Sequence, residues 1–166
     1  MVILGLDPGY ATIGYGVIEK TERGLFAIDY GVITTPAHET IAVRLAMIDE
    51  AMTAIMQKFK PECVAIEELF FNTNITTGIQ VAEARGVLLM SAKEAGLEIS
   101  EYTPLQVKQS VVGYGRADKK QVITMVQMIL NLVNQPKLDD TADALAIAIC
   151  HAHTGGSKLK NFYNLK

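Results

Sequence analysis

An apolar run at the start of the chain, Val2-Ile3-Leu4-Gly5-Leu6, stops at Asp7-Pro8-Gly9 and resumes over residues 12–18. Its continuous apolar character predicts a strand that is buried on both faces. The Pro8-Gly9 pair predicts a turn that lets a second strand return beside the first. Asp7 then stands at the end of a central strand, where its carboxylate can bind a cation or accept hydrogen bonds from the turn.

The rest of the chain alternates strand and helix patterns. A third strand at 24–34 completes an antiparallel meander, and a strand at 63–66, which follows a crossover helix, is expected to pair in parallel with the first. A last short strand is expected at 98–102. The expected helices span 40–58, 75–95, 104–111, the segment after the capping residue Asp118, and 139–153. This pattern predicts an α/β fold in which helices flank both faces of a mixed sheet of three antiparallel strands and two parallel strands.

Composition limits the class of protein. A chain of 166 residues with 49% hydrophobic and 20% charged residues fits a globular protein, with one domain at 1–154 and a flexible basic tail at 155–166. No secretory signal pattern and no membrane-length apolar stretch is present in the sequence, so we expect a cytoplasmic protein without membrane contact. Cys63 and Cys150 lie far apart in apolar segments and are expected to be buried thiols.

Charge is distributed unevenly along the chain. Residues 102–137 hold five basic residues against one acidic residue, a net charge of +4, and the tail from Thr154 adds three lysines and no acid. Because the whole chain has a net charge of −3, the remainder carries −10. This segregation is compatible with a basic surface for a polyanion beside an acidic site for cations, although an ordinary solvated helix face would have the same pattern.

Acidic residues stand at three element ends: Asp7, the pair Glu67-Glu68, and the segment 139–143. Asp140 and Asp143 are three residues apart and so project from one face of the last helix. Capping of that helix by Asp139 or Asp140 is the simpler explanation for one acid, but Asp143 opens a strongly apolar helix and is expected to face a partner.

If the first and fourth strands are adjacent, Asp7 and Glu67 end at the same edge of the sheet. Several uncompensated carboxylates share a site only with a cation, and oxygen ligands favour Mg²⁺ or Mn²⁺. The residues thus predict a two-metal site for phosphoryl transfer.

With these residues in place, the sequence resembles the RuvC family of Holliday-junction resolvases, within the ribonuclease H-like superfamily. The resemblance covers residues 2–153 and is specific because several short motifs occur in order. These motifs are Gly5-Leu6-Asp7-Pro8-Gly9 with Gly14-Tyr15-Gly16, Ile66-Glu67-Glu68-Leu69-Phe70, Glu83-Ala84-Arg85-Gly86, Gln106-Val107-Lys108-Gln109, and Asp140-Thr141-Ala142-Asp143-Ala144-Leu145-Ala146.

The resemblance implies a crossover junction endodeoxyribonuclease of DNA recombination and DNA repair. Such an enzyme is a homodimer that nicks two opposed strands of a four-way junction symmetrically, with two Mg²⁺ ions per active site or Mn²⁺ as a substitute. Asp7, Glu67, Asp140 and Asp143 match the catalytic, metal-binding acids. A branch-migration helicase complex of the RuvA and RuvB type is the implied partner.

The resemblance also implies DNA contacts. Phe70 matches a phenylalanine that stacks on bases near the junction centre, with Phe71 as a second candidate, and Lys108 and Lys119 match DNA-contacting lysines. Arg116 and Lys120 are expected to add phosphate contacts.

Several other positions concern the dimer surface, the end of the last helix and the strand faces. Ala82, Ala84 and Gly86 mark the helix at 75–95 as a candidate dimer surface. His151 and His153 are expected to interact with the dipole at the end of the last helix rather than with a metal. No role is assigned to Tyr114, and Glu68 is expected on the opposite strand face from Glu67.

Three alternatives stay open from the sequence. The Asp-x-Gly turn also resembles the phosphate loop of actin, hexokinase and heat-shock ATPases, although those proteins need two such domains. The second alternative is a junction-binding module whose acids only stabilise the fold. The third is a nuclease for linear duplexes or RNA–DNA hybrids.

Overall fold

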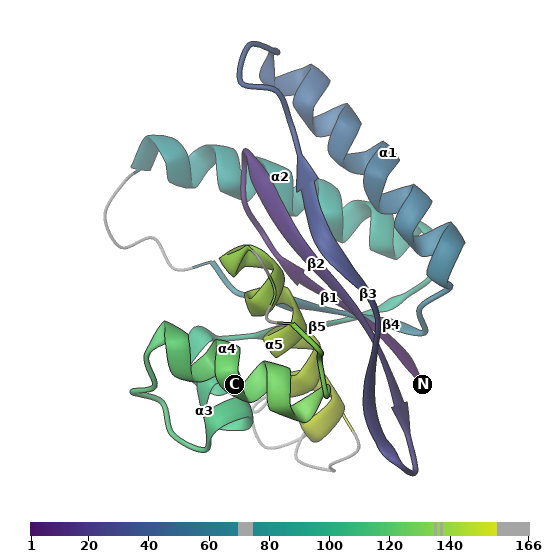
Figure 1. The fold of residues 1–166 in the computed structure, drawn as a ribbon. Helices are drawn as coiled ribbons and strands as arrows, with labels where there is room; N and C mark the ends of the chain where they lie inside the picture. The colour runs from purple at the N-terminus through teal and green to yellow at the C-terminus, as the bar shows by residue number, and fades with distance from the viewer. Residues whose placement is uncertain (70–74, 135, 137, 156–166) are drawn as a thin grey trace, which may run out of the picture.

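The structure is a computed structural model that describes residues 1–69, 75–134, 136 and 138–155. Within these residues, five strands form one sheet in the order β3-β2-β1-β4-β5 (Figure 1). The strands are β1 (Val2–Asp7), β2 (Thr12–Thr21), β3 (Gly24–Thr34), β4 (Cys63–Glu67) and β5 (Glu98–Tyr102). β1, β2 and β3 pair in antiparallel fashion, whereas β4 pairs in parallel with both β1 and β5. The predicted mixed sheet is therefore confirmed.

Helices cover both faces of this sheet, as expected (Figure 1). One face carries α1 (Ile41–Phe59) and α2 (Ile75–Glu94), and the other carries α3 (Pro104–Val112), α4 (Lys119–Ile129) and α5 (Asp139–Thr154). Thr103 caps α3 and Asp118 caps α4, each in a capping box with the glutamine three residues later. These caps set where both helices begin.

Alternation along β1 divides the interior into two cores. Leu4 and Leu6 pack in the core beneath α1 and α2, whereas Ile3 packs in the core beneath α3, α4 and α5. Successive side chains of a strand point to opposite faces, so Gly5 and Asp7 share the face of Ile3. The strand thus directs Asp7 toward α5.

The cysteines and the histidines of α5 test two further predictions. Cys63 and Cys150 are buried thiols, as predicted, and Cys63 Sγ lies 3.2 Å from His151 Nε2. His151 lies in the last turn of α5 but is buried, with Nδ1 2.8 Å from the Tyr102 hydroxyl, whereas His153 is exposed. His151 therefore belongs to a buried polar network and not only to the helix end.

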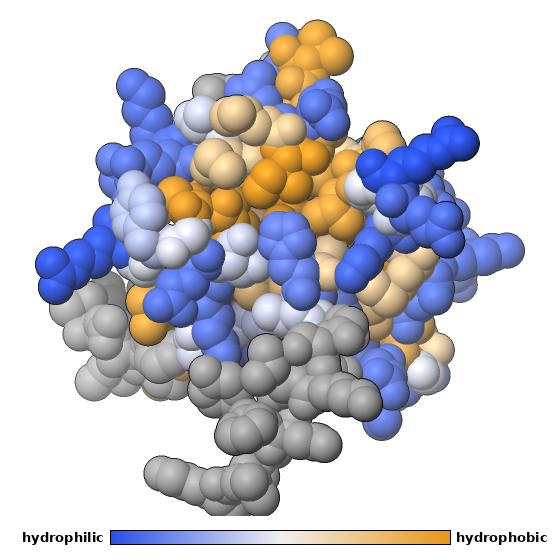
Figure 2. Space-filling model, turned by 90° about the horizontal axis from the view of Figure 1, so that it is seen from below, coloured by the Kyte–Doolittle hydropathy of each residue, from blue (hydrophilic) through white to orange (hydrophobic). Residues whose placement is uncertain are grey.

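The outer strand β3 leaves apolar side chains at the surface. Phe26 and Ile28 on β3 are 43% and 45% exposed. Apolar side chains also gather on the face that is seen from below, where hydrophilic side chains border them (Figure 2). A register shift opposite Val17 and Ile18 interrupts the β2–β3 ladder. Such a bulge hinders edge-to-edge pairing with another chain.

No helix among the described residues is both long and apolar enough to cross a bilayer. The division into a domain at 1–154 and a tail at 155–166 stays a prediction. The tail from residue 156 lies outside the described residues.

Arg44 was not expected in the interior, because it occupies a core position of α1 that the sequence pattern would fill with an apolar residue. It is only 2% exposed. Its Nε donates to Thr35 Oγ1 at 2.8 Å, its Nη2 donates to the Tyr10 carbonyl at 3.3 Å, and the guanidinium lies 3.5 Å from the Tyr10 ring centroid. Arg44 therefore ties α1 to the loop that follows Asp7.

We expect Arg44→Met to lower the free energy of unfolding by about 1.5–3 kcal/mol, because it removes charged hydrogen bonds from a buried site but keeps the apolar stem. Urea unfolding followed by circular dichroism measures this change. Arg23→Met, in the exposed turn between β2 and β3, is the matched control and should change stability by less than about 0.5 kcal/mol. Equal free energies of unfolding for Arg44→Met and Arg23→Met would contradict a stabilising role of the Arg44 hydrogen bonds.

Candidate metal centre and nuclease site

Two parallel strands deliver Asp7 and Glu67 to the same end and the same face of the sheet. In register, Leu6 of β1 pairs with Ile66 of β4, so the two acids follow neighbouring positions. Cys63 and Ala65 pack in the core beneath α5, and strand alternation gives Glu67 that face too. The carboxyl ends of the central strands therefore place both acids toward α5.

Helix α5 brings two further acids because it lies unusually close to the sheet. A Cβ built on Gly5 would collide with the Ala144 carbonyl, and one built on Gly14 would collide with the Asp140 carbonyl. Glycine is required at these two positions for the backbones to approach so closely. The same approach sets the first turn of α5 against the end of β1.

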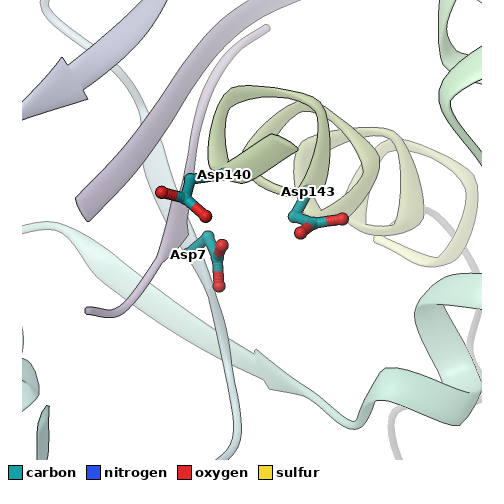
Figure 3. Close-up of side chains that lie close together, drawn as sticks. All are labelled: Asp7, Asp140 and Asp143. Atoms are coloured by element: carbon teal, nitrogen blue, oxygen red, sulfur yellow. The ribbon is translucent and has the colours of Figure 1, made fainter. Parts of the chain in front are cut away.

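Asp7, Asp140 and Asp143 form a compact carboxylate cluster. One ligand oxygen from each lies within 4.8 Å of the other two. Figure 3 shows Asp140 and Asp143 extending from α5 toward Asp7 at the end of β1. The N-cap residue of α5 is Leu138, whose side chain cannot accept a hydrogen bond, so neither Asp139 nor Asp140 is the N-cap. Helix capping therefore does not account for these acids.

Glu67 borders this cluster. It lines a cavity of about 100 Å³ together with Asp143, Lys108 and Lys119. Its charge raises the pKa of Asp7, and the charge of Asp143 raises the pKa of Glu67. The structure thus brings the four predicted acids into one electrostatically coupled site, in which Glu67 stands beside the three aspartates.

Burial and mutual repulsion favour the protonated form of these acids. Burial, followed by the charges of Asp143, Glu67 and Asp140, raises the pKa of Asp7 from 3.8 to about 8. Burial and the charge of Asp143 raise the pKa of Glu67 to about 7. Burial also raises the pKa of Asp143, although a hydrogen bond from Lys119 opposes this shift. Ionising all of them at neutral pH therefore requires positive charge nearby.

Lys119, at the start of α4, supplies part of that charge. Its ammonium group forms a hydrogen-bonded ion pair with Asp143 and lies 3.9 Å from Asp139. Burial lowers the pKa of Lys119, but the hydrogen bond and charge of Asp143, with Asp139 and Asp7, raise it overall. A side chain expected to touch DNA therefore also stabilises the acid cluster.

The other predicted DNA-binding residues have different positions. Lys108 is half-buried in the cavity wall, and Arg116 and Lys120 are exposed just before and within the first turn of α4. Phe70 and Phe71 lie outside the described residues. Of the predicted basic residues, Lys108 and Lys119 therefore line the acidic cavity, whereas Arg116 and Lys120 are exposed near the start of α4.

Arg85 is a contact of the site that sequence reasoning missed. Its Nε donates to the main-chain oxygen of Glu67 at 3.2 Å. The sequence signal for it is the motif Glu83-Ala84-Arg85-Gly86, in which Arg85 receives no role from the sequence.

A divalent metal fits the donor set present. The site offers clustered carboxylate oxygens, the hard ligands that Mg²⁺ and Mn²⁺ prefer. Burial and then the neighbouring acids raise the pKa of Asp7 and of Glu67, although Lys119 lowers both. Asp7, Asp140 and Asp143 are the residues best placed to hold an ion, with Glu67 beside them.

Comparison with known proteins identifies the family. Residues 3–151 match the family model for "Crossover junction endodeoxyribonuclease RuvC". The chain belongs to the RuvC family. The RuvC protein of Desulfitobacterium hafniense is 56% identical over 154 residues, which cover 93% of each chain. The RuvC protein of Clostridioides difficile is 54% identical over 93% of this chain and 91% of its own. The resemblance noted from the motifs is therefore confirmed.

Solved RuvC structures share the fold. Thermus thermophilus RuvC has a TM-score of 0.86 and 36% identity, and the match covers 94% of this chain and 96% of that one. T. thermophilus RuvC in complex with a Holliday junction substrate has a TM-score of 0.88 and 37% identity, over 93% and 94% of the two chains. Yeast mitochondrial Ydc2 shares the fold at 14% identity, with a TM-score of 0.69 over 91% of this chain and 77% of its own.

Raised acid pKa values make the metal-free protein less stable as pH rises. The folded values of about 8 for Asp7 and about 7 for Glu67 exceed the ordinary values of 3.8 and 4.5. At acidic pH the two acids are protonated in the folded and in the unfolded protein, so they cost no stability there. As pH rises from about 4 to about 8, they ionise more readily in the unfolded protein and lower the free energy of unfolding.

We expect Asp7→Asn, without metal at pH 7, to raise the free energy of unfolding by at least about 1 kcal/mol, or roughly 2–4 °C in Tm. Thermal unfolding across the pH range measures both the gain and the flatter pH dependence. Asp29→Asn is the control, because Asp29 forms a surface ion pair with Lys58 and should gain nothing. A less stable Asp7→Asn protein would refute the raised pKa.

Proposed function

We propose that this protein is a metal-dependent Holliday-junction resolvase, which nicks opposed strands of four-way DNA junctions in recombination and repair. The observation that carries the proposal is the cluster of Asp7, Asp140 and Asp143 beside Glu67, in a chain of the RuvC family. A related RuvC protein, that of T. thermophilus, has been solved with a Holliday junction substrate. Endonuclease activity is the general function, and the proposal adds that this activity depends on Mg²⁺ and acts on four-way junctions.

Asp7, Glu67, Asp140 and Asp143 are proposed to hold two Mg²⁺ ions, with Mn²⁺ as a substitute. When bound, such ions activate the attacking water and stabilise the leaving 3′ oxygen of the phosphodiester. The carboxylates would hold the ions from rigid elements, namely the ends of β1 and β4 and the start of α5. Lys119 limits the repulsion among the acids before ions bind.

Basic residues are proposed to position the junction over this centre. Lys108 and Lys119 lie in the wall of the acidic cavity, and Arg116 and Lys120 are exposed close in sequence to Lys119. They suit contacts with the phosphates that flank the scissile bond. Base stacking by Phe70 stays a prediction, since that residue lies outside the described ones.

We expect wild-type protein with Mg²⁺ to cut a synthetic four-way junction and Glu67→Gln to cut it more than about 100-fold more slowly, because metal ligands supply several kcal/mol and each 1.36 kcal/mol is tenfold. Denaturing gels of end-labelled strands measure the rates. The matched control, Glu50→Gln, changes an exposed glutamate of α1 and should keep the wild-type rate.

Each rival function predicts a different outcome of this assay. Junction binding without cutting by any variant would favour a non-catalytic binding module. Equal cutting of linear duplexes or RNA–DNA hybrids would favour a general nuclease, and nucleotide binding by the chain would revive the ATPase-like alternative.

A homodimer through α2 is part of this proposal. Ile79, Glu83, Gly86 and Met90 are exposed and follow one another at spacings of four, three and four residues, which places them on one helix face. Ile79 and Met90 are 54% and 50% exposed, and the space around Gly86 is open. Ala84, which the sequence assigned to this surface, is instead fully buried in the core. We call this stripe of four residues the α2 face.

We expect Met90→Lys to raise the dimer dissociation constant at least about 30-fold, because a two-fold contact would set the new charges near each other without partners. Size-exclusion chromatography with light scattering measures the mass over a dilution series. Met128→Lys on α4, where Met128 is 64% exposed, is the matched control and should leave the mass unchanged. A wild-type protein that is monomeric at every concentration would refute the dimer.

Association with a RuvA- and RuvB-type helicase complex stays a prediction from the family. So does the cytoplasmic location. The helicase partner follows from the family resemblance alone, and the location follows from the absence of a secretory signal pattern and of a membrane-length apolar stretch in the sequence.

A further inference from the structure

One turn of α2 has three different environments. In the motif Glu83-Ala84-Arg85-Gly86, Glu83 and Gly86 belong to the exposed α2 face, whereas Ala84 is fully buried in the core. The Arg85 side chain is only 16% exposed and extends toward the ends of β4 and β5. The motif therefore connects the proposed dimer face with the edge of the sheet that carries Glu67.

The guanidinium of Arg85 contacts two different strands. Its Nε donates to the main-chain oxygen of Glu67 on β4 at 3.2 Å, and its Nη2 forms an ion pair with Glu101 on β5. A guanidinium is planar and presents its donors in a rigid fork. When Glu101 fixes one branch of the fork, the direction of the other branch toward Glu67 is fixed as well.

Glu67 needs such a contact because it stands where the sheet is ending. The β1–β4 ladder stops at Leu6 and Ile66, one residue before Glu67. On the other side, the β4–β5 register ends at Glu67 and Tyr102, and Glu68 N donates to the Tyr102 carbonyl at 2.9 Å. The strand end is thus supported mainly by β5 while its carboxylate faces the repelling charges of Asp7 and Asp143.

We propose that Arg85 is a positioning residue that holds the main chain of Glu67, so that the Glu67 carboxylate stays directed at the aspartate cluster. Arg85 touches neither the reacting atoms nor the carboxylate itself, and it acts through the carbonyl of the same residue. The proposal rests on the proposed metal-dependent function only for the use that Glu67 makes of its position. A metal ligand must be held to within about 0.5 Å, and the residues that support it set that precision.

Isothermal titration of the full-length protein with Mn²⁺ tests the proposal independently of cleavage. We expect Arg85→Gln to weaken Mn²⁺ binding roughly 10- to 100-fold, the usual loss when the support of a metal ligand is removed. Glu101→Gln keeps the Nε contact and should cause a smaller loss. Arg23→Gln, an exposed arginine far along the β2–β3 hairpin, is the matched control and should bind Mn²⁺ like the wild type.

A purely structural role for Arg85 would give a different result. It would lower Tm but leave the Mn²⁺ affinity unchanged at temperatures where circular dichroism shows folded protein, and that result would overturn the proposal. If Arg85→Gln does not fold, Arg85→Lys decides the question, because lysine keeps the charge beside Glu101 but lacks the fork. Wild-type Mn²⁺ affinity in folded Arg85→Lys would overturn the proposal, and a loss of at least about tenfold would support it.

Cleavage assays separate this proposal from the proposed function. A positioning defect should be rescued as Mn²⁺ is raised, so the junction-cutting rate of Arg85→Lys should approach that of the wild type at saturation. If the wild type binds Mn²⁺ but cuts no junction, the proposed function fails, while the Mn²⁺ affinities still decide the role of Arg85.

Discussion

The close contact between α5 and the central strands is the constraint on which the rest of the structure depends. Gly5 and Gly14 let the helix backbone touch the sheet, and this contact brings Asp140 and Asp143 to the end of β1, where Asp7 stands. The resulting repulsion works against folding, so the apolar cores on both faces of the sheet must outweigh it. Because burial and repulsion raise the pKa of Asp7 to about 8 and that of Glu67 to about 7, we expect metal binding near neutral pH to release protons.

Much of this arrangement could be predicted from local patterns. The apolar run before Asp7 and the strand before Glu67 have the length and composition of buried strands, and a helix between them implies parallel pairing. Two acids three residues apart at the start of an apolar helix must share a face. These rules use only residues that are close in sequence and the alternation of side chains along a strand, so they can be applied without knowledge of tertiary contacts.

Other features depended on contacts that no local pattern contains. Arg44 occupies an apolar position of α1 because its guanidinium finds partners outside the helix. These partners are the Thr35 hydroxyl and the carbonyl and ring of Tyr10. Ala84 looks like a small interface residue, but the rotation of α2 turns it inward. Lys119 was expected on DNA, and its ion pair with Asp143 exists only because α4 and α5 lie side by side. Arg85 likewise reaches two strands that the sequence separates from it.

The glycines beneath α5 have a consequence for how this centre tolerates change. One added methyl group at Gly5 or Gly14 would meet a helix carbonyl, and α5 would have to move outward with both of its aspartates. Because interiors are tightly filled, such a displacement cannot be absorbed locally. The positions least open to substitution here are thus ones that contribute no functional group at all, and their role is to keep empty the space that the helix needs.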